Sequence, residues 1–154
     1  MKDPCDGEQN HGAFSIRNSN TMPHYLGQLR DWFEAEWEQV DSFEGNHAGV
    51  TVPTPIIAVD DQQLLLGGLS FTTFHRPESA RIGVWISALL VAPTHRKKGI
   101  ASQLIRSAEH ETNRLNLSEL FVLTDLPILY QRLGWTIVGT DRDNTILSKV
   151  LLDG

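Results

Sequence analysis

Cysteine is nearly absent from this sequence of 154 residues, which holds only Cys5, within a polar N-terminal stretch. A single cysteine excludes an internal disulfide framework and is typical of a protein kept in a reducing compartment. The stretch also lacks the apolar segment of a secretory signal. We therefore expect a cytoplasmic protein in which residues 1–12 form a frayed tail before one domain at residues 13–154. Cys5, lying in that tail, is a poor candidate for a nucleophile.

Long hydrophobic runs and excess positive charge are also missing. The longest nearly apolar segment, residues 84–93, is interrupted by Ser87 and falls short of the roughly 20 residues that span a bilayer. Lys and Arg number 13 against 19 Asp and Glu, which makes the formal net charge −6. This balance disfavours nucleic acid as a partner and is compatible with cationic substrates such as amines. We expect neither a membrane nor a nucleic-acid partner.

Motifs for metal and serine chemistry are absent as well. The six histidines show no metal-ligand spacing, and His110-Glu111 is not followed by the second histidine that H-E-x-x-H requires. The sequence has no G-x-S-x-G segment, which disfavours a serine hydrolase of that type. We therefore expect no metal cofactor.

The patterns that are present predict one domain with a mixed α/β (α+β) fold. The composition, 40% hydrophobic and 21% charged, suits a single core. Hydrophobic periodicity and turn residues predict strands at residues 13–17, 55–59, 64–74, 84–91, 120–124, 135–138 and 145–151. The strand–helix–strand unit at residues 84–124 implies one central parallel pair within a mostly antiparallel sheet. The adjacent Gly67 and Gly68 indicate a bulge or a close backbone approach.

Three helices are predicted to flank the sheet. The first is expected to be capped by Thr21 and to run to Val40, with its apolar face formed by Leu26, Leu29, Phe33, Trp37 and Val40. The second spans residues 101–115. The third is short, with Asp125 as its N-cap and Gly134 at its C-terminal end. Residues 42–54 and 75–83 are predicted to be loops.

The most informative segment is the basic loop at residues 96–101, between a buried strand and a helix. The first N–H groups of a helix lack internal partners and carry partial positive charge, so they favour a bound phosphate. Gly99 leaves room for such a group, and Arg96, Lys97 and Lys98 add positive charge. A solvated basic turn is the alternative interpretation. The spacing matches neither the Walker loop nor G-x-G-x-x-G.

Two motifs resemble those of the GNAT superfamily of N-acetyltransferases. Arg96-x-x-Gly99-x-Ala101 is similar to the family's acetyl-CoA motif, R/Q-x-x-G-x-G/A, and follows a matching Leu-Leu-Val-Ala-Pro strand and turn. Downstream, residues 129–135 (LYQRLGW) resemble the family's F/L-Y-x-x-L-G-F/W segment. The element order agrees too, so the resemblance covers nearly the whole chain and implies a GNAT-like single domain.

The resemblance implies how acetyl-CoA, the cosubstrate, is held. The strand before the loop splays from its parallel neighbour, and the backbone of Leu89, Leu90 and Val91 pairs with the pantetheine arm. One N–H near Leu90 then polarises the thioester carbonyl. The residues implied to contact the cofactor phosphates form one loop and helix start: Arg96, Lys97, Lys98, Gly99, Ile100, Ala101 and Ser102.

The resemblance also implies the reaction, which is direct attack of a primary amine of a small molecule or peptide on the thioester. Tyr130 matches the tyrosine that protonates the departing CoA thiolate. Its alternative role is that of a core tyrosine. Many members have a cofactor-binding asparagine a few residues upstream, where this chain has Thr124 and Asp125, and of their possible roles we favour Asp125 as a helix cap.

The base and the acceptor are the least defined parts. Trp85 lies where some family members carry a glutamate near the substrate, and Glu34, Glu36 and His75 are further candidates for the general base. The first helix and following loop hold six acidic residues without a basic one beyond Arg30. A cationic acceptor is our hypothesis for this run, and a solvated acidic face, the more frequent cause of such runs, is the alternative. A non-catalytic acyl-CoA-binding regulatory module is the alternative function. A homodimer through residues 145–151 is the expected assembly if one forms.

Overall fold

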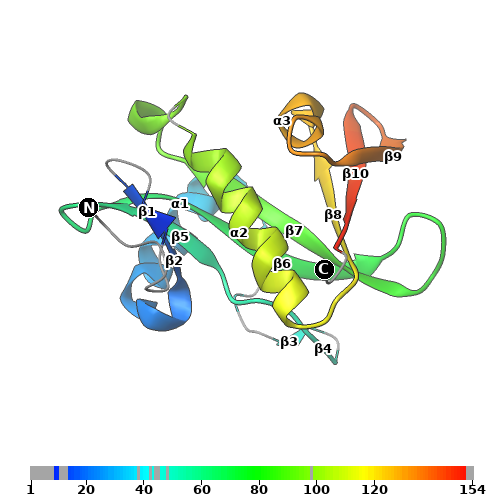
Figure 1. The fold of residues 1–154 in the computed structure, drawn as a ribbon, viewed down its shortest axis with the longest axis horizontal. Helices are drawn as coiled ribbons and strands as arrows, with labels where there is room; N and C mark the ends of the chain where they lie inside the picture. Colours follow the sequence, from blue (N-terminus) through cyan, green and yellow to red (C-terminus); the bar gives the residue numbers. More distant parts are fainter. Residues whose placement is uncertain are drawn as a thin grey trace.

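The computed structural model describes residues 9–10, 14–37, 39–41, 43, 46–47, 49–97 and 99–151. Within them one mixed sheet of eight strands has the order β1-β2-β5-β6-β7-β8-β10-β9, as Figure 1 shows. A separate two-stranded hairpin, formed by β3 (Asn46–His47) and β4 (Val50–Thr51), lies in the segment predicted to be a loop. The strands of the main sheet are β1 (Gln9–Asn10), β2 (Phe14–Asn18), β5 (Ile56–Asp60), β6 (Leu65–His75), β7 (Ile82–Val91), β8 (Glu119–Thr124), β9 (Thr136–Asp141) and β10 (Asn144–Val150).

The predicted parallel pair is confirmed at the centre of the sheet. Every neighbouring pair is antiparallel except β7 and β8, which are joined by the helix α2 (Ile100–Arg114). Because β7 and β8 are parallel, this connection has to cross over one face of the sheet. The mixed α/β fold class is therefore as predicted.

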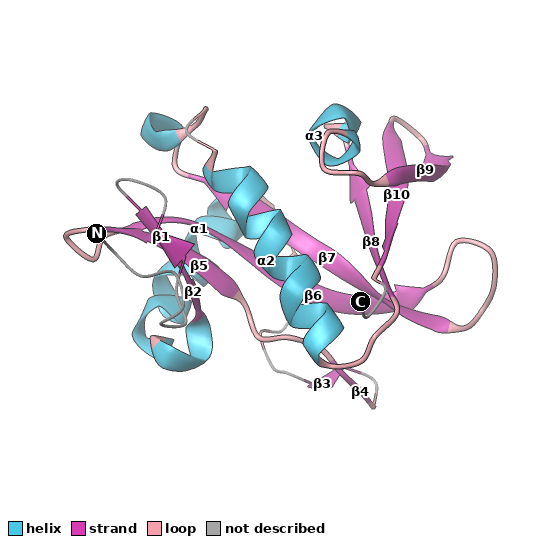
Figure 2. Cartoon of the chain, in the orientation of Figure 1, coloured by secondary structure: helices cyan, strands magenta, loops and turns pink. Residues whose placement is uncertain are grey.

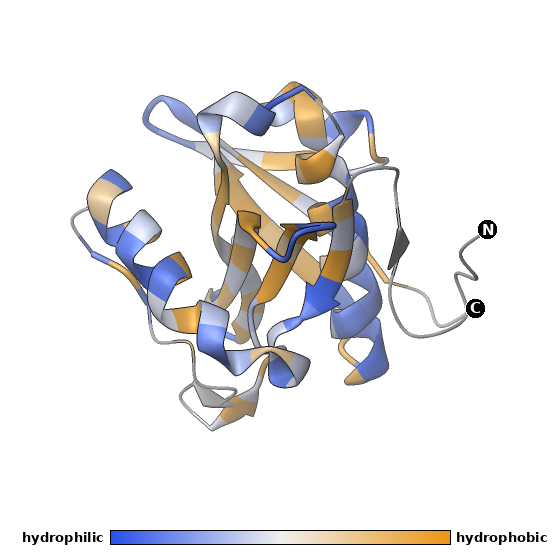
Figure 3. Ribbon diagram, turned by 90° about the vertical axis from the view of Figure 1, so that its left-hand side faces the viewer, coloured by the Kyte–Doolittle hydropathy of each residue, from blue (hydrophilic) through white to orange (hydrophobic). Residues whose placement is uncertain are grey.

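Helices cover both faces of the sheet, as Figure 2 shows. One core lies beneath α2, where Ile100, Leu104 and Ile105 pack against the strands. A second core lies on the other face beneath α1 (Leu26–Glu36), where the side chains of Leu29 and Phe33 are fully buried. Figure 3 shows hydrophobic strands enclosed by helices whose outer surfaces are more hydrophilic.

The first helix is shorter at both ends than predicted. Thr21 belongs to a 3₁₀ turn, Ser19–Thr21, that Asn18 caps, and a second such turn, Pro23–Tyr25, precedes α1. At its other end the backbone becomes extended at Trp37, so Val40 lies beyond the helix. The chain leaves the helix to make tertiary contacts, since Phe43 packs its ring edge-on against Phe33.

The short third helix, α3 (Pro127–Gln131), corrects two predicted boundaries. Asp125 is not its cap: Leu126 occupies the N-cap position, and the Oγ1 of Thr124 accepts a hydrogen bond from the Leu126 N–H at 2.9 Å. Gly134 does adopt the left-handed conformation expected of it, with φ +93°, but three residues after the helix ends.

The first and last strands of the chain both pair within the main sheet. Gln9 and Asn10 pair with β2 as β1, whereas the remainder of residues 1–12, including Cys5, lies outside the described residues. The last strand, β10, is paired on both sides, by β8 and by β9. Its backbone therefore offers no open sheet edge to a second subunit, and β9 forms that edge instead. None of the helices in the described segments is long and apolar enough to cross a bilayer.

Candidate active site

The basic loop connects the end of β7 to the start of α2. Val91 ends the strand, and a 3₁₀ turn, Pro93–His95, redirects the chain toward the helix. Gly99 stands at the N-cap with φ +84°, a left-handed conformation that glycine adopts without steric cost. No side chain caps the helix, so its first N–H groups lack a capping partner, and a Cβ on Gly99 would meet no atom within 4 Å.

The loop residues are arranged around this helix start. Ile100 is buried in the core, while Ala101 and Ser102 are partly exposed in the first turn. Arg96 and Lys97 are exposed, and Lys98 lies outside the described residues. A 15-residue helix presents a developed dipole here, so this end attracts an anion.

The parallel strands diverge beside this loop. β7 and β8 pair only at residues 84–86 of β7, which lie opposite residues 120–122 of β8. Beyond Ile86 the ladder ends, although β7 remains paired with β6 up to Val91. A bulge at Ser87, which the β6 register skips, marks the point of divergence. The sheet opens there on one side, as Figure 1 shows between β7 and β8.

In the diverging segment of β7, the backbone N–H and C=O groups of successive residues point alternately toward β6 and toward the open side. The N–H of Ala92 donates to the carbonyl of Leu66 at 2.8 Å, and hydrogen-bonded pairs recur at every second residue of an antiparallel ladder. Leu90 therefore directs its N–H and C=O toward Gly68 of β6, whereas Leu89 and Val91 direct theirs toward the open side. The Nε of Arg96 donates to the Val91 carbonyl at 3.0 Å, which agrees with this orientation.

A cleft of about 300 Å³ occupies the opening between β7 and β8. It is bounded by both diverging strands, by the turn before α3 and by α3 itself. The lining residues are Trp37, Ile86, Ser87, Ala88, Leu89, Val122, Leu123, Thr124, Asp125, Leu126, Leu129, Tyr130 and Asn144. The structure thus brings Leu89 and Tyr130, predicted from separate motifs, to one cleft.

Tyr130 lines this cleft from α3 with only 3% of its surface exposed. Its ring packs edge-on against Trp135, whose Nε1 donates to Glu109 on α2 at 2.9 Å. Burial disfavours the charged phenolate and so raises the pKa of Tyr130 well above the ordinary value. The hydroxyl consequently keeps its proton at any physiological pH.

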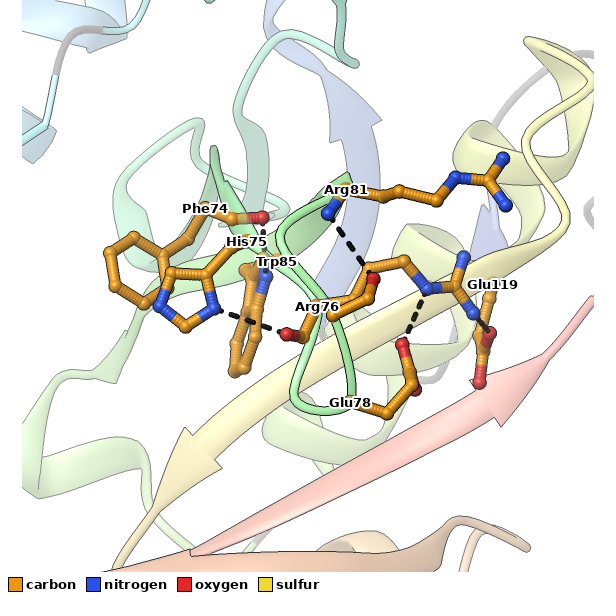
Figure 4. A network of polar contacts seen from close by, with 8 residues as sticks. Phe74, His75, Arg76, Glu78, Arg81, Trp85 and Glu119 are labelled. Atoms are coloured by element: carbon orange, nitrogen blue, oxygen red, sulfur yellow. Dashed lines mark hydrogen bonds and ion pairs between the residues drawn. The ribbon is translucent and has the colours of Figure 1, made fainter.

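A larger cleft of about 740 Å³ lies between the β6–β7 hairpin and the β9–β10 hairpin. It shares Ile86, Ser87 and Leu123 with the first cleft, so the two meet where β7 leaves β8. Of the predicted substrate residues, Trp85 and His75 line this larger cleft. The indole N–H of Trp85 donates to the carbonyl of Phe74 at 3.2 Å, as Figure 4 shows.

The acidic candidates on α1 do not reach either cleft. Glu34 is exposed and pairs with Arg30 at 3.4 Å, and it is not among the residues that line the two clefts. Glu36 lies near Arg96 at a separate, smaller depression. Among the described residues, no group of three or more His, Cys, Asp or Glu side chains is placed to hold a metal ion.

Two lining residues were not singled out from the sequence. Asp41 accepts a hydrogen bond from the Ser87 hydroxyl, and both residues line the larger cleft. The only sequence signal was Ser87 itself, a polar residue in an apolar strand. Asp41 comes from the segment after α1, and no local pattern indicates which acidic side chain of that segment reaches β7.

Each of these features matches a different part of acetyl-CoA. A pyrophosphate needs an uncapped helix start with room beside it, which Gly99 and α2 provide. An extended amide-bearing arm needs a strand edge without a neighbouring strand in a narrow cleft, which β7 provides at Leu89. The residues present therefore fit the cosubstrate.

Comparison with known proteins agrees with this arrangement. The acetyltransferase (GNAT) family matches residues 16–135, more than three quarters of the chain. No curated protein matches the sequence.

Solved structures share the fold at low sequence identity. N-acetylglutamate synthase from Neisseria gonorrhoeae, complexed with coenzyme A and N-acetyl-glutamate, superposes with a TM-score of 0.62 at 19% identity, covering 94% of this chain. This chain spans only 36% of the length of that synthase. Arabidopsis thaliana Naa50, bound to a bisubstrate analogue CoA-Ac-MVNAL, gives a TM-score of 0.65 at 17% identity, with 90% of this chain and 99% of that chain covered.

A third structure, the N-acetyltransferase YhbS from Escherichia coli in complex with CoA, gives a TM-score of 0.60 at 18% identity and covers 94% of this chain and 85% of its own. The likeness of these structures establishes the fold, and the family match establishes membership. The chain belongs to the acetyltransferase (GNAT) family and is an acyltransferase.

Proposed function

We propose that this protein transfers the acetyl group of acetyl-CoA to a primary amine of a small molecule or peptide by direct attack. The observation that carries the proposal is the meeting of two clefts at Ile86, Ser87 and Leu123. One cleft follows the open edge of β7 as far as Leu89, and the other lies between the β6–β7 and β9–β10 hairpins. A thioester in the first cleft and an amine in the second would meet at their junction.

The phosphates of acetyl-CoA are assigned to the start of α2. The N–H groups of Ile100, Ala101 and Ser102 are the unsatisfied donors of that turn. Gly99 leaves the approach to them open. Arg96, Lys97 and Lys98 supply positive charge around the same point. The cytoplasm, suggested by the single cysteine, is the compartment that we infer for this reaction.

The pantetheine arm is assigned to the open edge of β7. Leu89 directs its backbone groups into the cleft and Val91 directs its own to the same open side, so they can pair with the amides of the arm as an added strand would, with Arg96 already bonded to the Val91 carbonyl. Of the N–H groups near Leu90, that of Leu89 faces the cleft, and we assign it to the thioester oxygen. A donor aimed at a developing oxyanion contributes about 3 kcal/mol to catalysis.

Tyr130 is assigned as the proton donor to the leaving sulfur. The amine nitrogen attacks the thioester carbon, the C–S bond breaks, and the CoA thiolate takes the phenol proton. One proton passes from the ammonium to solvent before the attack, and the one surplus proton that the nitrogen carries after the attack restores Tyr130. Tyr130 suits the role because it lines the cleft and its phenol carries a proton, and the desolvated thiolate in the same cleft is a strong enough base to take it. No acetyl group is attached to the protein at any stage.

The test is CoA release from acetyl-CoA in the presence of a panel of primary amines, with the acetylated product identified by mass spectrometry. Direct attack predicts intersecting initial-rate lines when both substrates are varied. Parallel lines, or an acetylated protein, would contradict it. Tight acetyl-CoA binding with no CoA release for any amine would favour the non-catalytic acyl-CoA-binding module instead.

A further inference from the structure

The larger cleft is acidic, which bears on what the acceptor carries besides its amine. Its lining includes two carboxylates, Asp41 at the junction with the acetyl-CoA cleft and Asp141 at the end of β9. No Lys or Arg occurs among the described residues that line it. The guanidinium of Arg30 donates to the Asp41 backbone carbonyl at 3.4 Å and does not line the cleft. A ligand carboxylate placed in the cleft would therefore face two like charges in its described lining, an arrangement that suppresses binding.

Histidine 75 adds a further acceptor to this wall. The Nδ1 of His75 lies 3.1 Å from the carbonyl oxygen of Arg76, as Figure 4 shows. Because a carbonyl only accepts, Nδ1 carries the hydrogen, and Nε2 is the ring nitrogen that can accept when it bears none. With Asp41 and Asp141, the cleft therefore draws its polar groups from three separate segments of the chain, and its two carboxylates suit a ligand rich in N–H donors.

Aromatic side chains form the apolar part of the same wall. Trp85 and Phe74 both line the cleft, with ring centroids 6.1 Å apart in an edge-on arrangement. Phe74 remains 55% exposed, so its ring is available to a ligand. Such faces bind hydrocarbon or aromatic groups and also attract ammonium ions.

Asp41 is held in position at the inner end of the cleft. The Ser87 hydroxyl donates to its carboxylate, and Ser87 is the bulged residue at the divergence of β7 from β8. A carboxylate keeps further lone pairs when it accepts one hydrogen bond. Asp41 can therefore bind an ammonium group beside the point where the acetyl group arrives.

From this arrangement we infer that the acceptor is an amine without a carboxylate. Asp41 binds its ammonium group, and Asp141 repels any ligand that carries a carboxylate. Free amino acids are excluded as acceptors, whereas amines with an aromatic or alkyl body are accepted. This inference rests on the proposed function and concerns only the second substrate.

The experiment compares matched pairs that differ only in the carboxylate, phenethylamine against phenylalanine and tyramine against tyrosine. We expect kcat/KM for the amine to exceed that for the amino acid about 100-fold, because like charges face each other in the cleft. Phenylalanine methyl ester, which lacks the negative charge, should approach the amine. Equal rates within each pair, or faster acetylation of the amino acids, would overturn the inference.

Variants of the two carboxylates test their separate roles. Asp41→Asn should raise the KM for phenethylamine about tenfold or more, since a charged hydrogen bond is lost, while the KM for acetyl-CoA stays unchanged. Asp141→Lys should reduce the preference for amine over amino acid. Asp31→Asn on α1 and Asp143→Asn in the β9–β10 turn are the matched controls, since both are exposed and neither lines the cleft. Unchanged kinetics in Asp41→Asn would refute its role.

Binding measurements separate this inference from the proposed function. Calorimetry of phenethylamine and phenylalanine with protein saturated by CoA reports on the cleft even if no acetyl group is transferred. Tighter binding of the amine supports the inference whether or not turnover occurs. Tighter binding of phenylalanine contradicts it, although acetyl transfer to other amines would leave the proposed function intact.

Discussion

Gly67 lies so close to the backbone of Leu90 that a Cβ on this glycine would stand 2.7 Å from the Leu90 carbonyl oxygen. Gly67 is paired with Val91 in β7, beside the residues assigned to the pantetheine arm. The glycine thus sets how closely β6 approaches the open segment of β7. Backbone atoms cannot move aside as a flexible side chain can, so any larger residue has to displace the strand.

Gly67→Ala is therefore expected to lower the free energy of unfolding by about 1–3 kcal/mol, as overpacking does, and to raise the KM for acetyl-CoA. Urea denaturation and steady-state kinetics measure the two effects. The control is Gly139→Ala on β9, whose Cβ would meet only the end of Ile146, at 3.7 Å. If both alanine variants bind acetyl-CoA alike, the close approach does not position β7.

Gly99→Ala tests whether the start of α2 binds the phosphates of acetyl-CoA, and Gly49→Ala is its matched control. An alanine at φ +84° costs roughly 1–2 kcal/mol of strain, and its Cβ would project where we place the phosphates. We expect the Kd for acetyl-CoA to rise about tenfold, the loss of about one hydrogen bond. Gly49 has φ +82° with equal space around it but lies beside the β3–β4 hairpin. Gly49→Ala should lose similar stability while binding acetyl-CoA normally; a matching loss of affinity would count against the site.

Tyr130→Phe should lower kcat about 100-fold or more by removing the proton donor, and should leave the KM for acetyl-CoA nearly unchanged. The ring still packs against Trp135, so the fold is retained. Rates measured with acetyl-CoA from pH 6 to pH 9 check this. An unaltered kcat across that range would remove Tyr130 from the mechanism and leave it a packing residue.

The raised pKa of Tyr130 also predicts how the stability of the fold changes at alkaline pH. Its pKa is raised in the folded protein above the ordinary value of 10.0, so the unfolded chain loses this proton first. The stabilisation is complete below pH 10 and declines as the pH rises further, toward the folded pKa. Urea midpoints at pH 9 and pH 11 should fall less for Tyr130→Phe than for the wild type. Parallel losses in both proteins would show that other groups dominate.

Arg76 connects the β6–β7 hairpin to β8, as Figure 4 shows. Its guanidinium forms an ion pair with Glu119 and another with Glu78 at 2.8 Å, and it stacks over the Phe121 ring at 5.2 Å. Phe121 in turn stacks on Trp85, a lining residue of the larger cleft, with ring centroids 5.1 Å apart. These contacts position the aromatic wall of that cleft.

Arg76→Met should cost about 1 kcal/mol of stability, because it removes a partly exposed ion pair and a cation–π contact while keeping the apolar stem. It should also raise the KM for the amine more than the KM for acetyl-CoA. Arg114→Met, which breaks an exposed pair with Glu111 on α2, serves as the control. Equal changes in both KM values would mean that Arg76 acts on the whole fold and not on the acceptor wall.

Much of this fold was accessible from local patterns. The apolar runs at residues 84–91 and 120–124 and the helix between them predicted the parallel pair, because burial on both faces leaves little choice of residue. Thr21 and Asp125 were assigned wrongly as caps for a common reason. Both helices begin later than the polar residue suggested, at N-cap positions held by Tyr25 and Leu126 without a side-chain cap, because the path of the chain in three dimensions sets where each helix starts.

The candidate site divides in the same way. The motifs around Gly99 and Tyr130 could be found in the sequence because each requires particular residue types within a few positions. Asp41, by contrast, sits next to Ser87 across 46 residues of sequence. No local pattern records a contact over that separation.

The sequence by itself determined the basic, glycine-bearing loop and the helix that follows it, since backbone conformation and dipole at Gly99 depend on neighbouring residues. Only the tertiary structure decided that β7 and β8 separate after Ile86, which N–H groups face the opening, and which carboxylates line the larger cleft. Strand divergence and cleft lining arise from packing between distant segments, and such contacts are set by the folded chain as a whole.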